Sequence, residues 1–239
     1  MSRPLTTVFA SVLGAAIATS AVATPATAAG MYRISQESAP GVGDFDSNVL
    51  GFLDSFKTTG TIASFYQYSN GFAASFNGPV SLSSNASHLF LVDGSDGLGL
   101  FSVYDKPADI GGGIAHMQFD LVGDTAGFLA LDDPSEGYYT SNGSTFTTQN
   151  AWAPCCTDGF AIGSLDNDWT MFAQFSKLGS LSGGQLTSWK ALSDDGSSVS
   201  LALETNRKIR IDRVPEPATI VGLLAVAVGG SMTKRRDSI

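Results

Sequence analysis

Short runs of alternating apolar and polar residues constrain this chain most strongly, because a period of two is typical of a β-strand with one buried face. In the segment 114–121, Met117, Phe119 and Leu121 share one face, and Gln118 lies on the other. Similar runs recur along the chain, separated by turn-forming Gly, Asn and Asp residues. We expect strands over residues 61–68, 72–76, 88–92, 98–104, 114–121, 127–131, 169–176, 185–192, 199–204 and 208–212.

Ten or so short strands favour two packed sheets over a helical domain. We therefore predict that residues 29–213 form one all-β ectodomain, an antiparallel β-sandwich of jelly-roll type, with Trp169 and Trp189 in its core. An Asp-Gly step at 195–196 is typical of a hairpin loop and predicts an antiparallel final hairpin. The segment 44–57 also fits one face of a short helix, so helical and extended structure both remain open there.

The first 28 residues have the composition of a secretory signal peptide, not of a β-domain. Arg3 supplies a positive start, residues 8–18 form an apolar core, and Ala-Thr-Ala at 26–28 fits a cleavage site. An alternative site follows Ala-Val-Ala at 21–23. We assign residues 1–28 to a signal peptide, which predicts export.

The C-terminal segment 214–239 contains three elements in a fixed order. The apolar element has 15 residues, fewer than the ~18 to 20 of a comfortable membrane span. It predicts a short hydrophobic helix that anchors the chain in a membrane, with the basic cluster kept in the cytoplasm. In order, the elements are the block Val214, Pro215, Glu216 and Pro217, the apolar segment 218–232, and the basic cluster Lys234, Arg235 and Arg236.

This tail resembles the PEP-CTERM sorting signal of exported bacterial surface proteins. The resemblance covers about a tenth of the chain, and the extension Asp237-Ser238-Ile239 departs from the pattern. It implies processing near the Pro-Glu-Pro block by an exosortase, a membrane-embedded cysteine transpeptidase. It also implies an inner-membrane precursor, and then delivery to the cell surface or polysaccharide-rich extracellular matrix of a Gram-negative bacterium. An ordinary anchor that is never cut remains the alternative.

The ectodomain is acidic, and this excludes one class of partner. Residues 29–213 hold 9 Lys plus Arg and 20 Asp plus Glu, a net charge of −11. Such a domain repels polyanions, so we expect no nucleic-acid partner. Neutral glycans remain suitable, as do anionic ones bridged by divalent cations. The basic run 207–213 predicts a last strand with a solvated face, and contact with anionic lipid or polysaccharide is the alternative.

Cys155 and Cys156 are the two cysteines of the chain, and they are adjacent. Export favours oxidation, so a vicinal disulfide is possible; it would be strained and comparatively reducible, because adjacent Cα atoms lie only about 3.8 Å apart. Such a loop could sense redox state, face a ligand or simply be stiffened, and two free thiols are a further alternative. With His88 and His116 as the two histidines, a zinc site lacks ligands.

Motifs for catalysis are missing from the sequence. There is no Gly-x-Ser-x-Gly elbow and no phosphate-binding loop, and His88 and His116 fall in predicted strands. We therefore predict no enzymatic activity and no cofactor. A polysaccharide hydrolase that uses paired carboxylates remains a weaker alternative.

Oxygen ligands suggest weak candidate sites for a structural calcium ion. Asp44, Asp46 and Asn48 have the spacing of the first ligands of a calcium loop, although the later positions of an EF-hand are missing. Asp93 and Asp96 lie in a predicted turn, where Asp also caps backbone amides. Calcium binding would make the protein a calcium-dependent adhesin or lectin.

Aromatic residues near polar loops are candidates for stacking on sugars. The alternative, that they fill the core or the rim of the sandwich, applies to each of Tyr66, Tyr68, Tyr138, Tyr139 and Trp152. Taken together, the sequence predicts an exported, membrane-tethered surface protein with a non-catalytic domain that is structural or associated with exopolysaccharide.

Overall fold

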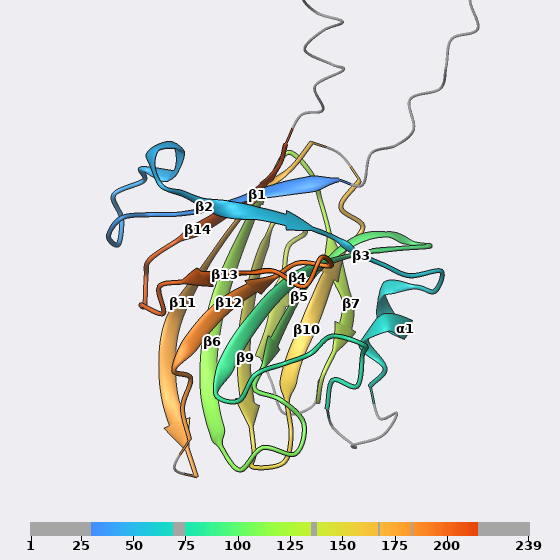
Figure 1. Ribbon diagram of the computed structural model, residues 1–239, viewed down its shortest axis with the longest axis vertical. Coiled ribbons are helices and arrows are strands. Elements are labelled where there is room, and N and C mark those ends of the chain that lie inside the picture. The colour runs from blue at the N-terminus through green and yellow to red at the C-terminus, as the bar shows by residue number, and fades with distance from the viewer. Residues whose placement is uncertain (1–29, 69–74, 135–137, 167, 183, 215–239) are drawn as a thin grey trace, which may run out of the picture.

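The protein forms two β-sheets packed face to face, with one short helix outside them (Figure 1). The computed structural model describes residues 30–68, 75–134, 138–166, 168–182 and 184–214. The predicted all-β sandwich is therefore confirmed at the level of its architecture. The expected signal peptide, the C-terminal helix, the residues of the tail beyond Val214 and most of the expected strand 72–76 lie outside the described residues.

The first sheet has seven strands, and every neighbouring pair is antiparallel. β1 follows the predicted signal peptide and pairs with β14, the last strand, so the two ends of the domain lie side by side (Figure 1). In spatial order the strands are β2 (Val49–Asp54), β1 (Met31–Gln36), β14 (Ile209–Arg213), β11 (Thr170–Leu181), β6 (Gly112–Val122), β9 (Thr145–Trp152) and β8 (Tyr138–Ser141).

The second sheet is mixed, which differs from the predicted antiparallel arrangement. β12 and β3 both run parallel to β4, whereas the other pairs are antiparallel. Alternation identifies a strand but not its direction, so the sequence pattern carried no signal for these parallel pairs. In spatial order the strands are β13 (Ser198–Leu201), β12 (Ser188–Leu192), β4 (Ala86–Gly94), β5 (Gly97–Tyr104), β10 (Asp158–Gly163) and β7 (Gly127–Leu131), with β3 (Phe56–Lys57) against β4.

The main core lies between the two sheets. Inward side chains of β6 and β11 form its centre, as the alternating pattern predicts. Trp169 stacks on Tyr32 at 5.6 Å between ring centroids, and Trp189 meets Phe175 at 4.8 Å. Both tryptophans are buried, which confirms their assignment to the core.

A second core covers the outer face of the second sheet. Phe90 and Phe101 point outward from β4 and β5 and are still fully buried. Helix α1 (Ile62–Tyr66) and the segment 75–82 pack over them, with Phe76 in contact with both rings. These two strands are therefore apolar on both faces, unlike the strands of the first sheet.

The expected strand over residues 61–68 is wrong, because part of this segment is helix α1. Thr61 caps the helix by accepting a hydrogen bond from the backbone N–H of Ser64. Ile62, Phe65 and Tyr66 then fall on one helical face and are buried against the second sheet. In the segment 44–57, a single 3₁₀ turn, η1 (Phe45–Ser47), is followed by β2 and β3, so most of it is extended.

Candidate functional site

The outer face of the first sheet is open to solvent over β8, β9, β6 and β11. Its side chains are mainly hydroxyls, amides and a carboxylate, and the edge residue Tyr138 is 71% exposed. Neighbouring strands lie about 4.8 Å apart, so four of them spread these groups over about 14 Å. We call this surface the polar face; its rows are Tyr138, Gln149, His116 and Lys177, then Thr140, Thr147, Gln118 and Gln174, then Thr145, Asp120 and Phe172.

Hydrogen bonds hold the centre of the polar face in a defined arrangement. The side-chain amide of Gln118 donates to both carboxylate oxygens of Asp120, each at 3.0 Å. The hydroxyl of Thr145 donates to the same carboxylate at 3.3 Å. Burial lowers the pKa of His116 from its ordinary value, which keeps the imidazole neutral at pH 7. The centre thus offers donors and acceptors held around one carboxylate, Asp120.

Ion pairs border the polar face on the side of β14 and β1. Asp212 accepts from Arg33 at 2.7 Å and lies 3.1 Å from Arg210. Arg210 also contacts Asp46 at 2.5 Å and lies over the ring of Phe45. The predicted basic run 207–213 is therefore partly β14, and much of its charge is neutralised within the first sheet.

The candidate calcium residues all have protein partners. The carboxylate of Asp44 accepts from the Ser38 amide, Asp46 pairs with Arg210, and the Asn48 amide donates to the Gln36 carbonyl. These residues lie beside η1. No group of three potential ligands suited to a metal ion occurs among the described residues.

The second candidate calcium group lies near β3 and α1. Asp93 forms an ion pair with Lys57 at 2.5 Å. Asp96 accepts from the backbone N–H of Ile62 at 2.8 Å and so caps the start of α1. Each carboxylate has a structural role in this arrangement.

A network of buried acids joins the two sheets at the β7 and β10 side of the sandwich. The carboxylate of Asp158 accepts from Asn150 at 3.0 Å, and Tyr139 bridges it to the carbonyl of Asp132. Asp132 in turn accepts from the hydroxyl of Tyr66 at 2.9 Å. Asp132 is 0% exposed and Asp158 is 5% exposed. Sequence pattern alone does not distinguish this pair, because an Asp in a turn and a buried Asp look alike.

Burial shifts the ionisation of this network strongly. Removal from water raises the pKa of Asp132 to about 8 and that of Asp158 to about 7; the charge of Asp158 adds to the first shift and that of Asp133 to the second. Burial likewise raises the pKa of Tyr66 and Tyr139. Because solvent does not reach the two carboxyls, they lack the open cleft that glycoside hydrolysis requires.

The candidate aromatic residues separate into two groups. Tyr66 and Trp152 are buried, the former against the second sheet and the latter stacked on Tyr104 in the main core. Tyr139 is partly buried and belongs to the acidic network. Tyr138 and Tyr68 are exposed, and Tyr138 is the one that lies on the polar face.

The two histidines lie in strands, as the sequence predicts. His88 is buried in β4, where its Nε2 accepts from the Ser83 amide at 2.9 Å and its Nδ1 lies 3.2 Å from the Val103 carbonyl. This pairing fixes the neutral tautomer with the proton on Nδ1, and burial lowers the pKa to about 4. His88 is therefore a structural residue.

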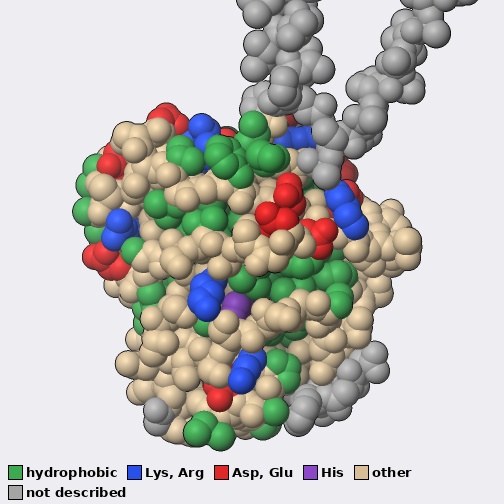
Figure 2. Space-filling model, in the orientation of Figure 1, with side chains coloured by type: hydrophobic (Ala, Val, Ile, Leu, Met, Phe, Trp, Pro, Cys, Tyr) green, Lys and Arg blue, Asp and Glu red, His purple; other side chains and the backbone are tan. Residues whose placement is uncertain are grey.

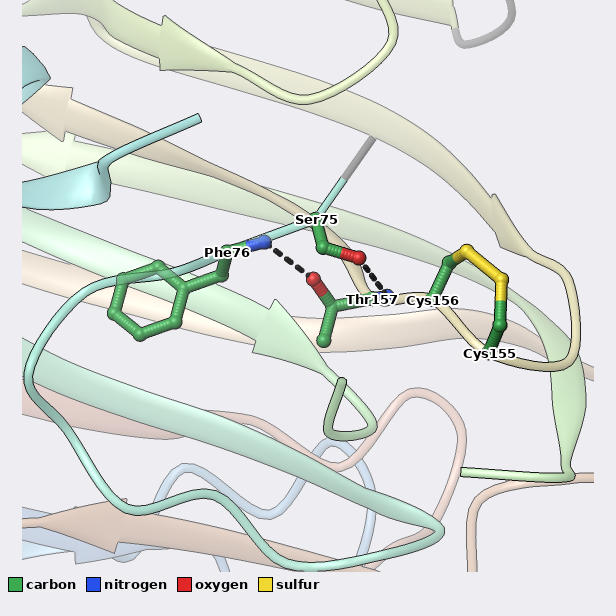
Figure 3. Close-up of a disulfide and its surroundings, with 5 residues drawn as sticks. All are labelled: Ser75, Phe76, Cys155, Cys156 and Thr157. Atoms are coloured by element: carbon green, nitrogen blue, oxygen red, sulfur yellow. Dashed lines mark hydrogen bonds between the residues drawn. A yellow bond between two sulfur atoms is a disulfide. The ribbon is translucent and has the colours of Figure 1, made fainter. Parts of the chain in front are cut away.

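A disulfide joins Cys155 and Cys156 in the loop between β9 and β10. Cys155 is exposed and Cys156 is half-buried, whereas the next residue, Thr157, is buried (Figure 3). The loop therefore presents the sulfur atoms near the surface, directly before the buried acidic network.

In the view of Figure 2, hydrophobic side chains gather at the end of the molecule formed by β1 and β2 and again near its middle, while Lys and Arg are scattered. Among the exposed apolar residues of these two strands are Met31 and Phe52, the latter 50% exposed. Within the described part of the chain, no helix has the length and hydropathy of a membrane span.

Comparison of the chain with protein-family models, with curated proteins and with solved structures gives no match.

Proposed function

We propose that this is an exported, membrane-tethered surface protein whose β-sandwich binds exopolysaccharide through the polar face, without catalysis. The arrangement of Gln118, Asp120 and Thr145 carries the proposal, because fixed amide, carboxylate and hydroxyl groups match the hydroxyls of a sugar. Tyr138 adds an exposed aromatic ring on which a sugar ring can stack. The Asp120 carboxylate and the acidic domain disfavour a polyanion, so the face favours a neutral glycan.

The jelly-roll type of the sandwich is part of the same proposal. The chain crosses repeatedly between the sheets, from β5 to β6, from β6 to β7, from β9 to β10 and from β10 to β11. Such crossing supports a jelly-roll-like arrangement, in which one broad face of a sheet is free to bind a ligand.

Replacing Tyr138 by Ala should weaken glycan binding about tenfold, equivalent to about 1.4 kcal/mol, because the stacking surface is lost. Gln118→Ala should weaken it similarly, since Asp120 then loses its positioning amide. Affinity electrophoresis of the full-length protein in detergent would measure this against neutral and anionic polysaccharides. Tyr68→Ala is the matched control, because Tyr68 is exposed but lies off the polar face.

Three results would change the assignment. Equal binding by wild type and both polar-face variants would show that the glycan site lies elsewhere. Binding abolished by a chelator and restored by calcium would instead support the calcium-dependent lectin. Release of reducing ends from any polysaccharide would support the hydrolase.

The tail supports the localisation part of the proposal, with an exosortase-type enzyme as the processing partner. Changing Pro215, Glu216 and Pro217 to Ala should leave export intact but retain the protein in the cytoplasmic membrane with its tail attached. Fractionation and intact mass of the protein would measure this. The control variant Lys234→Gln should still be processed, since the bases Arg235 and Arg236 remain. Unchanged surface delivery of the triple variant would indicate an ordinary anchor.

A further inference from the structure

Four consecutive residues, 155–158, fix three separate parts of the chain. Cys155 makes a reciprocal pair of backbone hydrogen bonds with the loop between β5 and β6. Its N–H donates to the Asp109 carbonyl at 2.6 Å, and its carbonyl accepts from the Ala108 N–H at 2.5 Å. This pair holds the centre of the loop 105–111, whose Ile110 is 89% exposed, whereas Asp105 at its start is held separately by the Ala86 carbonyl.

Thr157 makes a second reciprocal pair with the segment that covers the second sheet. Its N–H donates to the hydroxyl of Ser75 at 3.1 Å, and its hydroxyl accepts from the N–H of Phe76 at 2.6 Å (Figure 3). Phe76 is fully buried in the second core. Thr157 therefore attaches the covering segment to the start of β10.

Asp158 is the third anchor, and it is fully bonded. Its carboxylate accepts from the backbone N–H groups of Ala151 and Gly159, both at 2.6 Å, as well as from Asn150. A change in the backbone at 155–156 therefore lies within two residues of all three attachments, those of Cys155, Thr157 and Asp158. Breaking the disulfide can therefore disturb these hydrogen bonds, which a disulfide in a loop without such contacts would not do.

The backbone of Cys155 is in a conformation that L-residues rarely adopt. Its φ is +95°, a region open to glycine but costly for a residue with a Cβ. The ring that closes between adjacent cysteines restricts this peptide, and adjacent Cα atoms lie closer than in ordinary disulfides. The disulfide thus stabilises the conformation that presents the Cys155 N–H and carbonyl to the loop 105–111.

We propose that the Cys155–Cys156 disulfide is a thiol–disulfide exchange site for a dithiol reductant and that its reduction releases the loop 105–111. A thiolate of the dithiol attacks the exposed Sγ of Cys155, the S–S bond breaks, and Cys156 leaves as a thiolate that takes up a proton. The second thiolate of the reductant then attacks its own sulfur in the mixed disulfide. Cys155 leaves as a thiolate and is protonated, so two electrons and two protons have passed to the protein.

Dithiothreitol should reduce this disulfide in the folded full-length protein, giving two thiols that alkylation and intact mass can count. Hydrogen exchange should then become about tenfold faster over residues 105–111, because the positive φ of Cys155 is no longer held. Exchange at Asn206, whose N–H bonds to the Phe175 carbonyl far from this loop, serves as the internal control. Reduction only after unfolding, or unchanged exchange in the reduced protein, would overturn the proposal.

A pair of double variants separates the conformation of Cys155 from the presence of sulfur. Cys155→Ser with Cys156→Ser should exchange over 105–111 as fast as the reduced protein. Cys155→Gly with Cys156→Ser should remain more protected, since glycine accepts a positive φ without steric cost. Equal exchange in the two double variants would overturn the conformational basis of the switch. Neither measurement involves a glycan, so this proposal can fail while the proposed function stands, and the reverse.

Discussion

The free energy of unfolding should fall steadily as the pH rises from about 5 to about 7. Burial raises the pKa of Asp132 to about 8 and that of Asp158 to about 7, from an ordinary value of 3.8. The folded protein therefore holds two protons that the unfolded chain releases above pH 4. The stability linked to these protons is fully present below pH 3.8 and is lost as the pH rises through 7 and 8.

His88 acts in the opposite direction over a lower range. Burial lowers its pKa from 6.5 to about 4, so its contribution to stability is present above pH 6.5 and is lost as the pH falls through 4. Between pH 4 and 6.5 it offsets one of the two carboxyls. The offset ends over the same range in which Asp158 begins to release its own proton, so the slope should stay between about 1.4 and about 1.7 kcal/mol per pH unit from pH 5 to pH 7.

Denaturant unfolding at half-unit steps from pH 5 to pH 8 would measure this slope. Asp132→Asn replaces a protonated acid by a neutral group of the same shape, which removes one of the protons released on unfolding. The slope of the unfolding free energy against pH should therefore decrease by about 1.4 kcal/mol per pH unit. Asp195→Asn is the control, since Asp195 is exposed and hydrogen bonds lower its pKa, out of this range. A wild-type stability that stays constant from pH 5 to pH 8 would contradict the buried protonated pair.

Replacing Gly159 by Ala should destabilise the protein by about 3 kcal/mol, the upper part of the range for overpacked cores. A Cβ at this position in β10 would collide with the backbone carbonyl of Ser102 and lie 3.0 Å from the hydroxyl of Tyr66. The carbonyl belongs to the paired strand β5 and cannot move aside freely. Moving the Tyr66 hydroxyl away from the new Cβ would also break its hydrogen bond to Asp132.

Gly127→Ala provides the matched control in the neighbouring strand. A Cβ there has no atom within 4 Å, so the free energy of unfolding of the variant should lie within about 0.5 kcal/mol of the wild-type value. Thermal and denaturant unfolding of the two variants would measure the difference. Equal stability of the two variants would mean that β10 and β5 are not packed as closely as the structure has them.

Alternation in the sequence located strands well where the buried side chains are apolar. The expected segments 114–121 and 127–131 correspond to β6 and β7. β9 was missed because two of its buried positions hold Thr148 and Asn150, which an apolar pattern does not count. β10 was missed because it is rich in glycine and buried along its whole length, so it has no alternation.

Helix α1 was predicted as a strand because its three apolar residues also fit a short extended run. Only the cap at Thr61 and the spacing of Ile62, Phe65 and Tyr66 favour a helix, and five residues are too few for a periodic signal. In such a short segment, packing against the second sheet decides the structure, which the sequence pattern does not contain.

The composition of the polar face could not be predicted from the sequence, because strand register decides it. Gln118 lies opposite Gln174 of β11 and opposite Thr147 of β9. Both partners are far from Gln118 along the chain, and β9 was not among the expected strands. Strand pairing also brings the acidic pair together, since Asp132 follows β7, Asp158 begins β10, and these two strands are neighbours. Local signals identified individual residues, and long-range pairing brought them together.

The position of β14 has a mechanical consequence under the proposed tethering by the C-terminal tail. β14 is an interior strand, paired with β1 through residues 32–36 on one side and with β11 on the other. A pull on Arg213 along the strand loads these two ladders of hydrogen bonds in shear, so many bonds bear the force together. An edge strand pulled sideways would instead open one bond at a time. The proposed attachment point is therefore one at which the domain can withstand a pulling force.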